Sequence, residues 1–240
     1  MRPVLSVVIP AYNEAVRLPP TLREAFAWLS AHEPAHEIIV VDDGSRDETY
    51  ARAEALREEI PTLRVKGLGE NQGKGAAVRA GMLAARGRFR LFMDADHSTH
   101  IREWRKAKAL LEEGADVAIA SRKAPGAELA VRQPWWRERM GEAFNLLVRT
   151  RLGLRFRDTQ CGFKAFTAEA AERIFARLRL RGFGFDVEIL WLAEHMGLKV
   201  VEFPVLWAND PDSRVVVGRD LWRVWREVSS IPALHEGEER

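Results

Sequence analysis

The sequence has a single cysteine, Cys161, which excludes an intramolecular disulfide and a zinc site built from several cysteines. It also lacks any run of about 18 to 20 apolar residues, the length that a membrane-spanning helix needs. Neither charge is in large excess, because 37 Lys and Arg face 35 Asp and Glu. Whole-protein electrostatics therefore give no sign of a nucleic-acid-binding protein, and any basic surface must be local.

The first residues, "MRPVLSVVIPAYNE", lack both the apolar core and the small-residue cleavage site of a signal peptide. Together with the single cysteine, this predicts a protein of the cytoplasm. A chain of 240 residues has the length of one α/β domain of ordinary size.

Short β-branched runs alternate with longer segments of helical period through the first half of the chain. We expect strands at "LSVVIP", "HEIIVVDD", "LRVKGL", "RFRLFMD" and "DVAIAS", and helices over 18–31, 46–59, 73–85 and 102–113. Strands that are apolar on both faces and separated by amphipathic helices predict an α/β fold. Its sheet would be mainly parallel, with helices on both sides. In such sheets ligands bind beyond the carboxyl ends of the strands.

Asp94 and Asp96 follow one of these buried strands, one residue apart. Two like charges so close call for a shared proton or a bound cation, and carboxylate oxygens select Mg²⁺ or Mn²⁺. The alternative is an exposed turn with two solvated carboxylates. The neighbouring polar strand ends favour a metal site.

Asp42 and Asp43 end another strand, in "VVDDGSRDET". Gly44 permits a tight turn, and Ser45 or Asp47 can cap the next helix. Two consecutive aspartates exceed what capping needs, so we expect one of them to accept a hydrogen bond from a base or a ribose hydroxyl.

The segment 71–81, "NQGKGAAVRAG", is a glycine-containing loop that enters a helix. Its free N–H groups and the Lys74 ammonium are candidates for binding a phosphate. The spacing is not that of a Walker loop, and a plain helix start with a solvated lysine is the alternative.

Taken together, these motifs resemble family 2 glycosyltransferases of the GT-A fold, and within them the group that glucosylates or mannosylates polyprenyl (dolichyl) phosphates. The resemblance spans nearly the whole chain, through "VVIPAYNE", "VVDDGS", "NQGKGAAVRAG", "MDAD", "ASR", "DTQCGFKAF", "GFGFDVEIL" and "DPDSRV". The segments "DTQCGFK" and "FDVE" favour the dolichyl-phosphate β-glucosyltransferase branch over mannose synthases.

The resemblance implies a binding site for a nucleoside-diphosphate sugar, UDP-glucose or GDP-mannose. Its residues would be Pro10, Tyr12, Glu14, Asp42, Asp43, Lys74, Asp94 and Arg214, the last closing over the diphosphate. Asp94 and Asp96 match the DXD motif that holds Mg²⁺ or Mn²⁺. We expect Asp96 to be the main ligand and Asp94 to lie nearer the ribose or a metal-bound water. Ser98 replaces a glutamine ligand of mannose synthases, so a third protein ligand is not expected there. For His97 and His100 we expect packing or exposure to solvent.

On the acceptor side, the resemblance implies that Arg122 and Arg139 contact the lipid phosphate. A guanidinium binds phosphate oxygens with bidentate geometry. Because a lipid monophosphate is already anionic, inverting displacement at the sugar requires no general base. Asp158, Asp186 and Glu188 are candidates for orienting sugar hydroxyls or assisting as a base, and a structural role for Glu188 is equally open. We expect Cys161 to be a packed residue.

The resemblance divides one domain, 1–215, into a nucleotide-sugar-binding half (1–121) and an acceptor half (122–215). An amphipathic helix and polar tail follow, over 216–240. Basic and aromatic segments suit peripheral binding at the cytoplasmic face of a membrane, with Trp135, Trp136, Trp222 and Trp225 at the headgroup level. The alternative places these tryptophans in the core.

Two other functions stay open from the sequence. The first keeps the donor chemistry but uses mannose or a soluble acceptor. The second is a catalytically silent module that binds nucleotide sugars, and the intact Asp94 and Asp96 pair argues against it.

Overall fold

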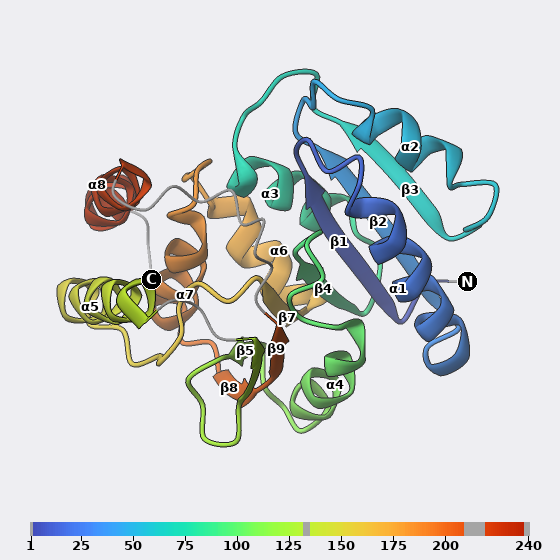
Figure 1. Cartoon of the computed structure of the whole chain (residues 1–240). Helices are drawn as coiled ribbons and strands as arrows, with labels where there is room; N and C mark the ends of the chain where they lie inside the picture. Colours follow the sequence, from blue (N-terminus) through green and yellow to red (C-terminus); the bar gives the residue numbers. More distant parts are fainter. Residues whose placement is uncertain (1, 132–134, 209–218, 238–240) are drawn as a thin grey trace.

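A central sheet of seven strands organises the chain. The structure, a computed structural model, describes residues 2–131, 135–208 and 219–237, apart from the side chains of 129–131, 135–138, 144 and 219–221. The strands are β1 (Leu5–Ala11), β2 (His36–Asp42), β3 (Leu63–Gly67), β4 (Phe89–Met93), β5 (Val117–Ser121), β7 (Phe163–Thr167) and β8 (Val200–Pro204). Their order across the sheet is β3-β2-β1-β4-β7-β5-β8 (Figure 1).

Strand β7 is antiparallel to both of its neighbours, β4 and β5, and the other pairs are parallel. The expectation of a mainly parallel sheet is therefore confirmed, with one reversed strand that the sequence pattern did not predict. A small second sheet pairs β6 (Glu128–Val131) with β9 (Leu206–Ala208).

Helices cover both faces of the large sheet, as predicted. One face packs against α1 (Leu18–His32), α2 (Thr49–Ala55) and α4 (Trp104–Glu112), which follows a short 3₁₀ helix, η1 (Ile101–Glu103). The other face packs against α3 (Lys74–Ala84), α6 (Ala168–Arg177) and α7 (Phe185–His195). The strands bury both faces: Leu5, Val7 and Ile9 belong to one apolar cluster, and Val8 to the other. This explains their continuous apolar sequence.

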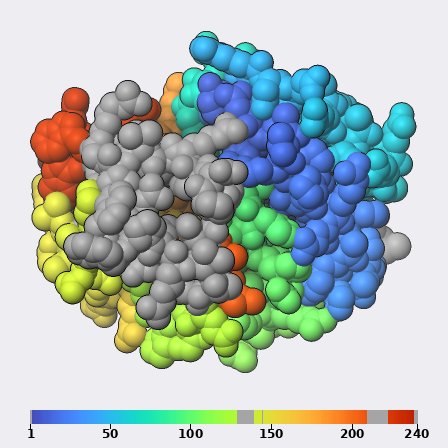
Figure 2. Space-filling view, in the orientation of Figure 1, coloured from blue at the N-terminus to red at the C-terminus, as the bar shows by residue number. Residues whose placement is uncertain are grey.

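Two further helices, α5 (Trp135–Leu152) and α8 (Arg219–Leu234), pack against each other beside α7. Figure 2 shows them at one end of the molecule, in yellow and red, away from the blue N-terminal elements. The inner side of α8 buries Val224, Val228 and Ile231, whereas Trp222 is 65% exposed. Trp222 therefore lies outside the buried side of α8 that carries Val228. Within the described parts of the chain, no helix combines the length and the apolar character needed to cross a membrane.

The helix predicted over 46–59 is confined to α2, because polar side chains before it serve the loop after β1. Ser45 Oγ accepts a hydrogen bond from the Asn13 N–H at 2.9 Å. Asp47 accepts one from the Ala15 N–H at 3.2 Å and one from the Thr49 N–H at 3.0 Å, where α2 begins. The side chains that would extend α2 toward residue 46 instead bind the loop after β1, so the helix begins only at Thr49.

Candidate active site

Most of the predicted site residues meet at the carboxyl edge of the sheet. Residue pairs from Leu5–His36 to Ala11–Asp42 place the ends of β1 and β2 level with each other. Asp94 directly follows β4, the other neighbour of β1, and Arg122 directly follows β5. Pro10 is buried within β1, and Tyr12 is half-buried just beyond it. β1 lies between β2 and β4, where the order of the strands changes direction, and open α/β sheets bind ligands at such a point of the carboxyl edge.

Asp42 and Asp43 are both buried but play different parts. Asp42 Oδ2 accepts a hydrogen bond from the Ser45 N–H at 3.1 Å, while Asp42 Oδ1 is buried with no hydrogen-bond partner among the described residues. Gly44, in the turn between Asp42 and Ser45, has φ of +68°, a value that favours glycine. An unpaired buried carboxylate oxygen is costly, so Asp42 Oδ1 is a candidate for contact with a ligand donor.

Asp43 instead holds the glycine-containing loop. Its carboxylate accepts hydrogen bonds from the N–H groups of Gln72 and Gly73, at 2.8 and 2.9 Å, and from Asn71 Nδ2 at 3.1 Å. Burial raises the pKa of Asp43, although the two backbone donors oppose that shift. Asp43 therefore fixes the loop that leads into Lys74, a contact that sequence reasoning did not foresee.

Glu14 is also engaged within the chain. Its carboxylate receives hydrogen bonds from Arg17 Nε and Nη2, at 2.7 and 2.6 Å, and its N–H donates to Thr49 Oγ1. The structure thus places Glu14 at the rim formed by the loops after β1 and β2, with its charge paired.

Lys74 reaches from the start of α3 to the end of β4. Its Nζ lies 2.6 Å from Asp94 Oδ1. Burial would lower the pKa of the Lys74 ammonium, but Asp94 and then Asp186 outweigh burial and raise it. Lys74 is therefore a fixed positive charge beside the paired aspartates, at the site where the sequence predicts a diphosphate.

Asp96 lies two residues further along the same loop. Its Oδ1 accepts a hydrogen bond from the Ser98 N–H at 3.0 Å. Burial, and then the nearby charge of Asp94, raise the pKa of Asp96. Ser98 thus supports a carboxylate rather than offering an obvious third ligand.

Gly162 makes room for Asp94. The Gly162 carbonyl accepts a hydrogen bond from the Asp94 N–H at 3.1 Å, across the β4 and β7 pairing. A Cβ on Gly162 would lie 2.0 Å from Asp94 Oδ2. Only a glycine permits this approach, so the "CGF" segment, which leads into β7, shapes the site of the Asp94 carboxylate.

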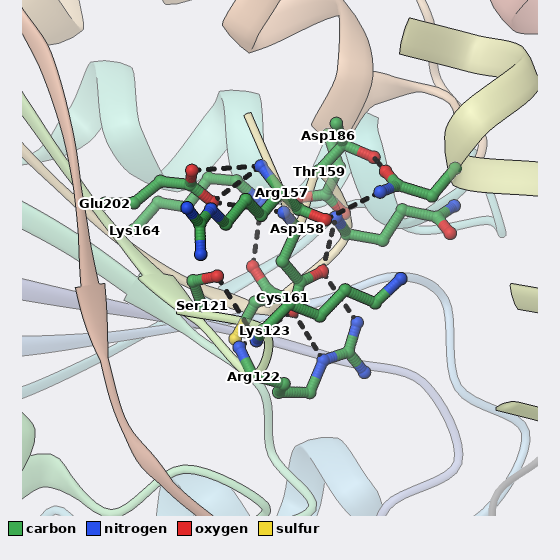
Figure 3. A network of polar contacts seen from close by, with 12 residues as sticks. Ser121, Arg122, Lys123, Arg157, Asp158, Thr159, Cys161, Lys164, Asp186 and Glu202 are labelled. Atoms are coloured by element: carbon green, nitrogen blue, oxygen red, sulfur yellow. Dashed lines mark hydrogen bonds and ion pairs between the residues drawn. The ribbon is translucent and has the colours of Figure 1, made fainter. Parts of the chain in front are cut away.

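Arg122 and Asp158 form a compact ion pair at the end of β5 (Figure 3). Arg122 donates to Asp158 from Nε at 2.7 Å, from Nη2 at 2.9 Å and from its backbone N–H at 3.0 Å. The guanidinium carbon lies 5.4 Å from the ring centroid of Trp207. Burial would raise the pKa of Asp158, but Arg122 holds it well below its ordinary value. Asp158 is therefore a permanent anion that fixes Arg122.

Asp186 and Glu188, the other two carboxylates of this region, are occupied as well. Asp186 forms an ion pair with Lys164, a wholly buried lysine on β7 whose Nζ also donates to the Cys161 carbonyl at 2.7 Å (Figure 3). Glu188 accepts the N–H groups of Arg179 and Leu180, at 2.8 and 2.7 Å. The Lys164 pairing could not be predicted from the sequence, since the lysine stands among apolar strand residues.

Cys161 is packed, as predicted. The side chain is 1% exposed, and burial, followed by the charge of Asp158, raises its pKa to about 12. Such a thiol stays protonated and is a poor nucleophile.

Arg139 and Arg214 are the remaining arginines that the sequence predicts for the site. Arg139 is exposed on α5. Arg214 lies outside the described residues, as do the side chains of Trp135 and Trp136. The structure thus brings together Asp42, Asp43, Lys74, Asp94, Asp96, Arg122 and Asp158 around one edge of the sheet and leaves Arg139 on the surface.

The carboxylates of Asp94 and Asp96 fit a divalent cation. They are close enough for Asp94 to raise the pKa of Asp96, and both offer the oxygen ligands that Mg²⁺ and Mn²⁺ prefer. The Lys74 ammonium partly offsets their charge. Asp94 and Asp96 would hold the cation, which would supply positive charge to an anionic ligand at this edge.

Comparison with known proteins identifies the family. The family model described as Glycosyl transferase family 2 matches residues 6–175. The chain is 39% identical over 241 residues to "Dolichyl-phosphate beta-glucosyltransferase" of Drosophila melanogaster, covering 92% of this chain and 74% of that protein. The chain belongs to glycosyltransferase family 2. The human dolichyl-phosphate beta-glucosyltransferase is 36% identical over 241 residues, which cover 90% of this family 2 chain and 73% of that protein.

Solved structures support the same fold for this family 2 glycosyltransferase. Glucosyl-3-phosphoglycerate synthase of M. tuberculosis superposes with a TM-score of 0.70 at 23% identity, over 100% of this chain and 82% of that one. A second structure of that enzyme, with Mn²⁺ and uridine-diphosphate-glucose, gives a TM-score of 0.69 at 21% identity, over 100% and 80%. The predicted family, the predicted GT-A fold and the expectation of a hexosyltransferase are confirmed.

Proposed function

We propose that this chain transfers glucose from UDP-glucose to a polyprenyl phosphate of the dolichyl type, with inversion at the sugar and with Mg²⁺ or Mn²⁺ as cofactor. The curated relatives named above are dolichyl-phosphate β-glucosyltransferases, and they align with about nine-tenths of this chain. GDP-mannose is the alternative donor, and a soluble phosphate ester is the alternative acceptor.

The observation that carries the proposal is that all three carboxylates that could act as a base already bind groups of the protein. Asp158 is bound to Arg122, Asp186 to Lys164, and Glu188 to two backbone N–H groups. A sugar hydroxyl acceptor would need one of them as a proton acceptor. Arg122 lowers the pKa of Asp158 and makes it a weak base, and the other two carboxylates are engaged by Lys164 and by backbone donors. A phosphate monoester is already anionic near neutral pH and needs none. The occupied carboxylates therefore favour a phosphate acceptor.

On the donor side, Asp94 and Asp96 would hold the metal ion, which supplies positive charge to the departing nucleoside diphosphate. Lys74 adds a second positive charge at the same place. Asp42 Oδ1, buried and unpaired among the described residues, would accept a hydrogen bond from the base or the ribose. Asp43 keeps the loop before Lys74 in position.

On the acceptor side, Arg122 would bind the lipid phosphate. Two of its side-chain nitrogens are used by Asp158, and Nη1 has no partner among the described residues. The residues on either side of Asp158 contact α5: Asn145 on that helix donates to the Arg157 carbonyl at 2.6 Å and accepts from Thr159 Oγ1 at 3.0 Å. The phosphate-binding arginine and α5 are thus parts of one connected unit.

We further propose that α5 and α8 place the enzyme at the cytoplasmic surface of the membrane that holds the acceptor. Leu146 and Leu147 on α5 are 59% and 48% exposed, and Trp222 on α8 is 65% exposed. Exposed Arg151 lies on the same helix as the two leucines. Apolar and aromatic side chains flanked by arginines are typical of surfaces that bind lipid headgroups.

The test is transfer of radiolabelled sugar by the purified protein. UDP-glucose and GDP-mannose are each supplied with Mn²⁺, with Mg²⁺ or with EDTA, and dolichyl phosphate is compared with 3-phosphoglycerate as acceptor. We expect glucose in the lipid product only, from UDP-glucose only, and loss of product with EDTA. Product from 3-phosphoglycerate and none from the lipid would contradict the proposed acceptor. Asp96→Asn should lower turnover at least about 100-fold, since a charged transition state loses its metal.

A further inference from the structure

The loop that carries Asp94 and Asp96 is held by α1. Thr21 Oγ1 donates to the Ala95 carbonyl at 2.9 Å, and both groups are buried. One turn further along α1, the Glu24 carboxylate contacts Nε2 of His97 with one oxygen and Nε2 of His100 with the other. Two successive turns of α1, at Thr21 and at Glu24, thus contact the loop on either side of Asp96.

Glu24, His97 and His100 have the composition of a zinc site, and one ligand atom from each lies within 4.8 Å of the others. The hydrogen positions argue against that role. His100 Nδ1 accepts the Arg102 N–H at 2.9 Å, so in the neutral ring the proton sits on Nε2, which faces Glu24. His97 Nδ1 is buried without a partner among the described residues. A proton there would be a buried unpaired donor, so it too belongs on Nε2.

Both imidazoles therefore present N–H groups to Glu24, and a protonated nitrogen cannot bind a metal. The contacts also support a backbone conformation that is unfavourable for a residue with a side chain. His97, directly after Asp96, has φ of +64°, in the left-handed region. The two hydrogen bonds to Glu24 stabilise this turn.

The opposite side of the loop is held by β9. The Ala208 N–H donates to the Ser98 carbonyl at 3.0 Å, and Trp207, the preceding residue, lies beside Arg122. The loop from Asp94 to His100 is thus fixed between α1 and β9. Of the two sides, the contact with Glu24 uses charged and polar side chains alone, so it can be removed without disturbing backbone pairing.

We propose that Glu24 is a positioning residue for the metal site: through His97 and His100 it fixes the turn that orients Asp96. The proposal rests on the proposed function in so far as Asp94 and Asp96 bind a divalent cation. Residues that orient metal ligands from outside the coordination shell typically change metal affinity 10-fold to 100-fold when mutated. Glu24 acts one step further away, and we expect an effect of about tenfold.

The experiment compares Glu24→Ala and Glu24→Gln with the wild type and with Glu59→Gln. Glu59 is a matched control, because it accepts from Arg23 on the same helix in an exposed ion pair away from the loop. Mn²⁺ affinity in the presence of UDP is measured by electron paramagnetic resonance, and amide hydrogen exchange of residues 95–100 is measured without metal. We expect Glu24→Ala to weaken Mn²⁺ binding about tenfold and to speed exchange in the loop. Glu24→Gln, which keeps one amide oxygen as acceptor, should fall between, and Glu59→Gln should match the wild type.

Wild-type Mn²⁺ affinity in Glu24→Ala would overturn the proposal, even if the loop exchanges faster. A cobalt absorption spectrum of tetrahedral type in the wild type, lost in Glu24→Ala, would overturn it in favour of a metal site at the two histidines. If the wild type itself binds no Mn²⁺ with UDP, the proposed metal site fails and Glu24 has no metal ligand to position. These results are distinct, because only the last concerns the wild type's affinity for Mn²⁺.

Discussion

The side chains of Arg122 and Asp158 are joined by two parallel hydrogen bonds, and a third runs from the Arg122 backbone N–H to the same carboxylate. Asp158 is 2% exposed and is itself held in place, because its own N–H donates to Glu202 at 3.1 Å. The guanidinium is thus fixed before any ligand arrives, which reduces the ordering that phosphate binding would require.

Replacing Asp158 by asparagine should impair acceptor binding. The variant keeps the volume but removes the charge and one acceptor oxygen, so Arg122 is no longer held in one geometry. A hydrogen bond to a charged group is worth about 1.5 to 3 kcal/mol, which corresponds to about 10-fold to 100-fold in kcat/KM for polyprenyl phosphate. Arg122→Lys should show a loss of similar size, because lysine cannot bind bidentately. Steady-state kinetics with varied lipid phosphate check both, and unchanged kcat/KM in either would contradict this role.

The same pair predicts how stability depends on pH. Because the folded-state pKa of Asp158 is lowered, its stabilising contribution is present above its unfolded pKa of about 3.9 and is lost as pH falls below that value. Urea unfolding of the wild type and of Asp158→Asn should therefore give a difference in unfolding free energy that is constant from pH 5 to 7. The difference should shrink below about pH 4. A difference that grows on acidification would refute the assignment.

Gly162→Ala should damage the carboxylate site without touching a charged residue. The added methyl group would lie 2.0 Å from Asp94 Oδ2, so the carboxylate or β7 must move. We expect a loss of about 1 to 3 kcal/mol in unfolding free energy, together with weaker Mn²⁺ binding. Gly141→Ala is the matched control, since nothing lies within 4 Å of its added Cβ on α5, and alanine favours a helix. Equal Mn²⁺ affinity in the two variants would argue against a metal at Asp94.

Membrane attachment should depend on the exposed leucines of α5. The double change of Leu146 and Leu147 to serine removes apolar surface that is open to solvent, so binding to vesicles of anionic lipid should weaken while the fold persists. Leu83→Ser on α3, where the leucine is 40% exposed, controls for the loss of exposed apolar surface. Vesicle sedimentation and circular dichroism measure the two properties. Undiminished vesicle binding by the double variant would exclude this part of α5 as the membrane contact.

Much of this site could be predicted because its residues follow buried strands directly. Asp42, Asp94 and Arg122 each stand at the point where an apolar run ends, and a mainly parallel sheet brings such points to one edge. Their position therefore follows from local pattern plus a general rule of topology. The comparisons confirm the family that these motifs indicated.

The pairings of charge could not be predicted, because they join residues far apart in the chain. Asp186 and Lys164 are 22 residues apart in the sequence, and Glu24 and His97 are 73 residues apart. Lys164 sits between Phe163 and Ala165 in a strand, where the apolar pattern hides the inward direction of its amine. The reversed direction of β7 was equally hidden, since the long segment between β5 and β7 allows either orientation.

The place of β7 also constrains the order in which the protein can be completed on the ribosome. Strand β5 is synthesised well before β7, yet its partners in the sheet are β7 and β8, both made later. Until residues 163–167 emerge, the apolar β5 has no neighbour and β4 keeps an open edge, which are features that invite aggregation. Assembly of the sheet thus requires β7 to insert between β4 and β5, which are made earlier, and β8 then pairs with the other side of β5.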